Sequence, residues 1–78
     1  MFWSTPERKL SQRAEKARRR VARMKTPDLP GWGDQAFTEL SMSYREWRRH
    51  EQSVNLEDAI VGAEALLAVL EELRSRGV

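Results

Sequence analysis

The residues able to carry out chemistry are few and lie apart along the chain. His50 is the single histidine, with Glu46 one helical turn before it and Glu51 directly after it. A metal site needs three or four ligands, and neither a cysteine nor a second histidine exists to complete one. We therefore expect His50 to be a solvated residue in the last turn of a helix, and we predict no metal and no cofactor.

The serines, glycines and carboxylates form no recognisable catalytic arrangement either. None of the serines stands in a nucleophile elbow. The segment Gly31-Trp32-Gly33 is not followed by the Gly-Lys-Ser/Thr of a phosphate-binding loop. Neighbouring acids such as Glu57 and Asp58 point about 100° apart on a helix, which keeps them from sharing a site. The sequence predicts that the protein is not an enzyme.

Charge is the strongest signal in the sequence. The first 26 residues hold nine cations and two acids, a net charge of +7, whereas residues 27–78 hold five cations and ten acids, a net charge of −5. The whole chain carries only +2. A basic arm joined to an acidic body indicates a polyanionic partner or a protein partner of complementary charge.

Length and composition restrict the class of protein. A chain of 78 residues, with 40% hydrophobic and 33% charged residues, is one small domain, too apolar for a disordered chain. No stretch approaches the roughly 18 apolar residues of a membrane span, and the first residues lack the pattern of a secretory signal. The bias toward arginine over lysine fits a high-GC genome, such as an actinobacterium or its phage. We expect a cytoplasmic protein, or a virion component if it is phage-derived.

The basic arm, residues 1–26, is predicted to be one helix, with Thr5 as its N-cap and Pro6 in the first turn. Its apolar residues are spaced by 4, 3, 4 and 3 and form a narrow stripe, which is typical of a coiled-coil seam: Leu10, Ala14, Ala17, Val21 and Met24. Phe2 and Trp3 precede this helix, which is also an interfacial membrane pattern. The alanine-rich stripe makes a membrane partner the weaker interpretation, so we expect Phe2 and Trp3 to anchor the arm in a protein groove.

A Pro/Gly turn at residues 27–34 is predicted to follow, because Pro27, Pro30, Gly31 and Gly33 disfavour a helix. Trp32, within this turn, is expected to fold back onto a neighbouring helix. Asp34 is then expected to cap a second helix that ends near residue 51. The apolar stripe of that helix is Phe37, Leu40, Tyr44 and Trp47.

A third helix is predicted over residues 56–75, with a capping box at Asn55 and Asp58 and a C-cap at Gly77. Apolar residues cover about half of its surface, which indicates more than one neighbour. The fold class is therefore all-α, a basic N-terminal helix plus an antiparallel helical hairpin in residues 35–78, with coiled-coil-like packing. We expect Leu67 and Leu70 in the core of this hairpin. Whether the N-terminal helix, a second copy or a larger partner covers the rest of the third helix stays open.

The predicted function is protein–protein interaction, as a small structural or adaptor subunit in an assembly. The basic arm would bind the partner through its cations: Arg13, Arg18, Arg19, Arg20, Arg23 and Lys25. The apolar seam at Leu10, Val21 and Met24 would bind as well. One form of this hypothesis docks the arm of one copy on the acidic flank of another copy, at Glu57, Glu64 and Glu71. The alternative is an accessory protein that binds nucleic acid nonspecifically through phosphates, because no base-reading motif is present.

Overall fold

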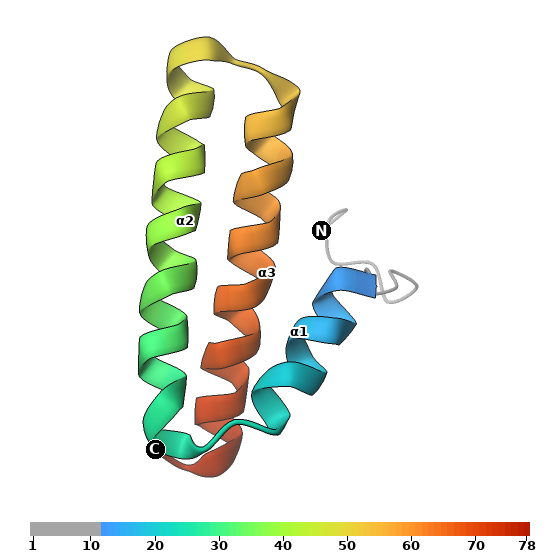
Figure 1. Cartoon of the computed structure of the whole chain (residues 1–78), viewed down its shortest axis with the longest axis vertical. Coiled ribbons are helices and arrows are strands. Elements are labelled where there is room, and N and C mark those ends of the chain that lie inside the picture. The colour runs from blue at the N-terminus through green and yellow to red at the C-terminus, as the bar shows by residue number, and fades with distance from the viewer. Residues whose placement is uncertain (1–11) are drawn as a thin grey trace, which may run out of the picture.

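The computed structural model describes residues 12–78, and these residues form an all-α fold. Helix α1 spans Gln12–Ala22, a short 3₁₀ turn η2 spans Thr26–Asp28, and two longer helices follow, α2 (Leu29–His50) and α3 (Ser53–Arg76). α2 and α3 pack as an antiparallel hairpin, and α1 lies beside α3 (Figure 1). The predicted fold class and hairpin are confirmed. Residues 1–11 lie outside the described residues, and with them the predicted cap at Thr5 and the anchor at Phe2 and Trp3.

The helix boundaries near residue 30 differ from the prediction. α2 begins at Leu29, so residues 29–34 are helical, and Asp34 is not its cap. Pro30 stands in the first turn, where its missing N–H needs no partner. Gly33 is buried, and a Cβ atom there would lie 3.2 Å from Cγ1 of Val69, so the glycine serves helix packing rather than a turn. α1 ends at Ala22, short of the predicted end at residue 26.

The connection between α2 and α3 is shorter than predicted. Only Glu51, in the left-handed region with φ 53°, and Gln52, which is extended, lie between the two helices. Asn55 and Asp58 are both inside α3, so the predicted capping box is wrong. At the other end, Gly77 has φ 75° and its N–H donates to the carbonyl of Arg74, which confirms the predicted C-cap.

α2 and α3 approach each other closely enough for glycine to be required. A Cβ atom at Gly62 would lie 3.0 Å from the backbone N and 3.1 Å from the Cα of Leu40. Alanines line the same contact, since Ala36 and Ala59 are both buried. Small residues therefore define where the two helices touch.

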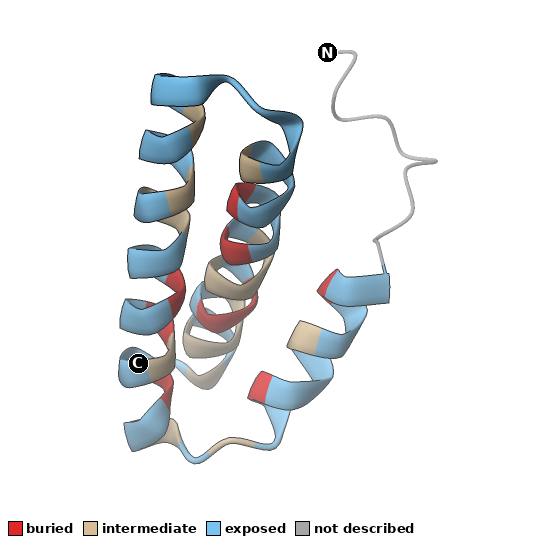
Figure 2. Ribbon diagram, turned by 45° about the horizontal axis from the view of Figure 1, so that its top comes forward, coloured by how far each residue is buried: buried red, intermediate tan, exposed pale blue. Residues whose placement is uncertain are grey.

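The core lies where α1, α2 and α3 meet. Its buried cluster is Val21, Leu29, Ala68 and Val69. Four partly buried residues pack against this cluster: Ala17, Met24, Trp32 and Leu73. Figure 2 shows the buried residues on the inner sides of the helices. The expectations that Trp32 packs against neighbouring helices and that the third helix has more than one neighbour are confirmed.

The prediction that large apolar residues form the core of the hairpin is wrong. Leu67 is 50% and Leu70 is 53% exposed, and Phe37 and Tyr44 are also exposed. The reason is the small-residue contact between α2 and α3. Because Gly62 and the alanines face the other helix, the large side chains on either side of them turn toward solvent.

Candidate functional site

The apolar seam of α1 packs within its own chain. Ala14 and Val21 are buried, and Ala17 and Met24 are half-buried against the core. Two of the three residues assigned to partner binding, Val21 and Met24, are therefore covered by the chain itself. The third, Leu10, lies outside the described residues.

Ion pairs flank this seam and join α1 to α3. The Arg13 guanidinium lies 3.7 Å from the Glu57 carboxylate and 3.6 Å from that of Glu64, and Arg18 lies 2.7 Å from Glu71. These are the charges that the sequence suggested for docking between copies. The structure pairs them inside one chain, so the acidic flank of α3 is already engaged.

Arg76 makes a further link that the sequence analysis missed. Its Nη1 donates to Oγ1 of Thr26 at 3.0 Å, and its Nη2 donates to the carbonyls of Val21 at 3.1 Å and Ala22 at 3.3 Å. Its Nε donates to Oε2 of Glu72 at 2.8 Å. One guanidinium thus satisfies carbonyls at the open end of α1 and holds that end on α3. No sequence signal marks this contact, because Thr26, Val21 and Ala22 lie 50–55 residues from Arg76 in the chain.

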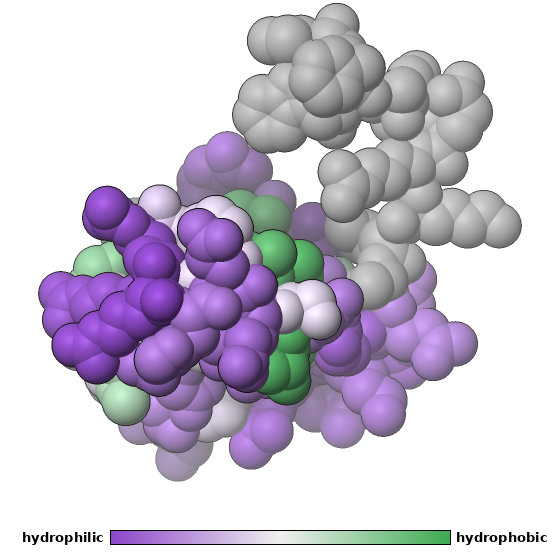
Figure 3. Space-filling view, turned by 90° about the horizontal axis from the view of Figure 1, so that it is seen from above, coloured by the Kyte–Doolittle hydropathy of each residue, from purple (hydrophilic) through white to green (hydrophobic). Residues whose placement is uncertain are grey.

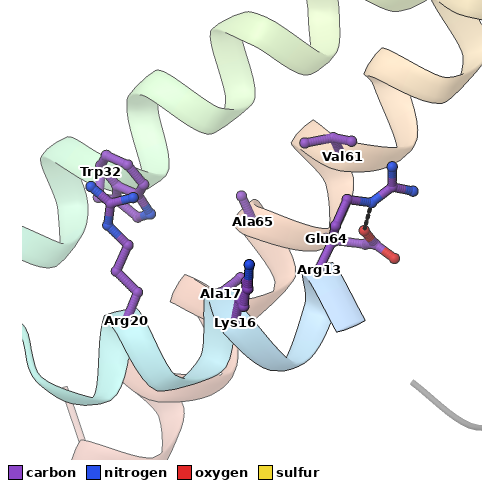
Figure 4. A pocket seen from close by; sticks show the side chains of 8 residues that line it. All are labelled: Arg13, Lys16, Ala17, Arg20, Trp32, Val61, Glu64 and Ala65. Carbon is purple, nitrogen blue, oxygen red and sulfur yellow. Dashed lines mark ion pairs between the residues drawn. The ribbon is translucent and has the colours of Figure 1, made fainter. Parts of the chain in front are cut away.

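A hollow of about 210 Å³ lies between α1, α2 and α3 (Figure 4). Arg20 stacks over the Trp32 ring at one side, 4.5 Å from the ring centroid, and the Arg13–Glu64 pair lies at the other. Binding sites for small molecules usually measure about 300–1,000 Å³. The hollow is smaller than that range, and it holds Arg20 against an aromatic face, a stabilising cation–π contact.

The outer side of α1 keeps part of the positive charge. Arg19 is exposed there, Lys16 is exposed at the edge of the hollow, and Arg23 and Lys25 are exposed in the segment that follows α1. Arg19 lies 3.4 Å from Glu15, one turn earlier. Of the six cations assigned to the basic arm, Arg23 and Lys25 remain directed to solvent with no ion pair among residues 12–78.

His50 lies in the last turn of α2, as predicted, and its side chain is exposed. Its Nε2 is 3.8 Å from Oε1 of Glu46. Within residues 12–78, no cluster of three histidine, cysteine or acidic residues is placed to hold a metal ion.

Exposed apolar residues gather in the sector of α3 that neither α1 nor α2 covers and on the adjoining side of α2. We call this surface the hairpin face. It consists of two exposed residues of α2 and five of α3: Phe37, Tyr44, Leu56, Ile60, Ala63, Leu67 and Leu70. The five on α3 are spaced by 4, 3, 4 and 3, the pattern of a coiled-coil seam.

A groove of about 470 Å³ lies at one end of this face, between the start of α2 and the end of α3, with Asp34 and Phe37 on α2 and Leu66 and Leu70 on α3 among its walls. Figure 3, which looks onto the end with the α2–α3 connection, shows apolar side chains reaching the surface among mostly polar ones. The spacing of these residues was visible in the sequence. The missing information was which stripe of the apolar third helix is left uncovered.

No helix among the described residues is both long enough and apolar enough to cross a bilayer. The chain matches no model of a known protein family, no curated protein and no solved structure.

Proposed function

We propose that this protein is a small structural or adaptor subunit that acts by protein–protein interaction, and that the hairpin face is its binding surface. The observation that carries the proposal is the gathering of six large apolar side chains, each 39–58% exposed, in one sector: Phe37, Tyr44, Leu56, Ile60, Leu67 and Leu70. Monomeric soluble proteins rarely expose a continuous apolar surface beyond a few hundred Å², and such surfaces usually mark interaction sites.

The size of the face supports this function. From Leu56 to Leu70 it extends about 21 Å, at 1.5 Å per residue. Two helices packed about 10 Å apart make it about 20 Å wide. The resulting flat area is about 400 Å², and an exposed apolar patch of this size is often a functional surface.

The fold does not need these side chains for its core. The core cluster is built from other residues, such as Val21 and Val69, which are each 1% exposed. Large apolar residues that contribute little to folding are then available for binding a partner.

Site-specific photo-crosslinking in the native host tests this function. A benzophenone amino acid replaces Leu67 on the hairpin face, and the matched control replaces Arg23, an exposed residue directly after α1. We expect protein adducts from position 67 and few from position 23. Equal yields from the two positions, or no protein adduct from position 67, would contradict the proposed function.

Nonspecific nucleic-acid binding is a second candidate, favoured by exposed cations on α1 and in the segment directly after it. Lys16, Arg23 and Lys25 have no ion pair among the described residues. If these three cover three phosphates, the log–log slope of duplex affinity against salt is about −2.7. Changing all three to Gln should remove that slope, and unchanged binding after the change would rule this candidate out.

A further inference from the structure

We propose that the occupant of the hairpin face is a second copy of this chain, packed antiparallel about a two-fold axis. This inference rests on the proposed function and names its partner. It is supported by the self-complementary order of residues on α3, by a matching charge order on α2, and by the area of the face.

The stripe on α3 reads almost the same in both directions. In an antiparallel pair centred on Ala63, Leu56 lies opposite Leu70 of the second copy, and Ile60 lies opposite Leu66, one residue from Leu67. Each large aliphatic side chain therefore meets another. The smallest side chain of the stripe stands at the crossing point, where two helices need to approach most closely. A two-fold interface requires this kind of self-complementary surface.

The edge of the face on α2 carries charges in the order that the same arrangement needs. Asp34, Ser41 and Arg48 are seven residues apart and so run along one line of α2, beside Phe37 and Tyr44. Asp34 also lines the groove of the face. When α2 packs antiparallel to its copy about Ser41, Asp34 of each chain faces Arg48 of the other, so the two-fold axis creates two ion pairs.

A single two-fold axis can pass through the centres required on both helices. The close contact between Gly62 and Leu40 fixes their relative height, since a Cβ atom at Gly62 would lie 3.0 Å from the Leu40 nitrogen. The centres required on α3 and α2, Ala63 and Ser41, each lie one residue from this contact. At a rise of 1.5 Å per residue, they are level to within about 3 Å.

The buried area indicates a dimer of moderate strength. Two flat faces of about 400 Å² bury about 800 Å², and the relief of the side chains raises the total toward the roughly 1,200 Å² at which standard interfaces begin. Interfaces at this small end of the size range belong mostly to weak complexes, so we expect association in the micromolar range.

Analytical ultracentrifugation of the full chain, over concentrations from about 1 to 500 µM, tests the dimer. We expect the mass to rise from monomer to dimer over this range. Leu67→Glu should keep the chain monomeric throughout, while the matched control Arg23→Glu should dimerise like the wild type. Because Leu67 is 50% exposed, circular dichroism should show unchanged helicity in the variant.

A charge exchange tests the antiparallel register. Asp34→Arg and Arg48→Asp should each weaken dimerisation about tenfold or more, because each places like charges opposite each other across the axis. The double variant should restore it to within about threefold of the wild type. A heterologous contact, or one on another face, gives no such rescue.

Three results would overturn the inference: a wild type that stays monomeric at the highest concentration, a dimer that survives Leu67→Glu, or a charge exchange without rescue. The photo-crosslinking experiment separates this failure from failure of the proposed function. If the wild type is monomeric while position 67 crosslinks to a different protein, the second copy is excluded and the interaction function stands. If position 67 gives no protein adduct, the proposed function fails as well.

Discussion

Helix α3 touches α2 through backbone and α1 through side chains. Toward α2, Gly62 lies against the backbone of Leu40, and the contact is apolar and close. Toward α1, Val21 forms the centre, and ion pairs and Arg76 form the rim. The described part of α1 spans 11 residues, and a helix of this size draws most of its stability from tertiary packing. We therefore expect the hairpin to be the stable unit, and α1 to be helical only while it is docked.

The largest expected effect is at Leu29, because this residue belongs to both contacts. It is 0% exposed and lies in the cluster with Val21 of α1 and Val69 of α3. Leu29→Ala should lower the free energy of unfolding by about 2–5 kcal/mol, the usual cost of truncating a buried leucine. That is a large part of the total stability of so small a domain. Urea unfolding followed by circular dichroism measures the change.

Leu67→Ala is the matched control for Leu29→Ala. With Leu67 half-exposed, its truncation should cost less than about 1 kcal/mol. Equal losses at the two positions would mean that the core is centred on the large residues of α3, as the sequence alone suggested.

The close contact within the hairpin predicts opposite signs for two glycine substitutions. Gly62→Ala should destabilise the protein by about 1–3 kcal/mol, because the new Cβ meets the backbone of Leu40, which can yield only if the helices separate. At Gly31, no atom lies within 4 Å of the added Cβ. Gly31→Ala should therefore be neutral or stabilise by up to about 1 kcal/mol, through helix propensity. Thermal melts of both variants test this pair, and a stabilising Gly62→Ala would show that the helices are not in backbone contact.

Much of the fold could be predicted from local signals. The spacing of apolar residues by three and four, and the short break after residue 51, predicted an antiparallel hairpin, because these signals depend only on neighbours in the chain. The face that each helix buries could not be predicted in the same way. Large residues such as Leu67 and Leu70 dominate an apolar pattern, whereas the contact is set by Gly62 and Gly33, whose partners lie more than 20 residues away.

The partners of the charged residues could not be predicted from local signals either. Arg13 and Arg18 were expected to pair with the acids of the third helix, and the structure pairs them, but within one chain rather than between two. Spacing along a helix is identical in the two cases. The difference depends on the path of residues 23–28, which lets α1 run beside α3, and that path is a tertiary property.

Arg76 predicts a smaller effect that is confined to the α1 contact. Arg76→Met removes the donors to Thr26, Val21 and Ala22 but keeps the aliphatic stem, and should cost about 1–2 kcal/mol. In hydrogen exchange, the amides of α1 should lose protection while those of α2 keep it. Arg74→Met, an exposed arginine of the same turn, is the control and should change neither. Equal loss of protection in α1 and α2 would mean that the two contacts open together.

The smallest expected effect is at the ion pair of Arg18 and Glu71. The nitrogen and oxygen are 2.7 Å apart, but the two side chains remain 45% and 33% exposed, so water competes for both charges. A double-mutant cycle with Arg18→Gln and Glu71→Gln should therefore give a coupling energy of about 0–1 kcal/mol. In 1 M salt, where screening acts within about 3 Å, that coupling should shrink further. The cost of Gly62→Ala should not shrink, because it arises from overlap of atoms and not from charge. A coupling above about 2 kcal/mol that persists in 1 M salt would contradict this difference, and would make the rim of charges, rather than Val21, the main contact that holds α1 on the hairpin.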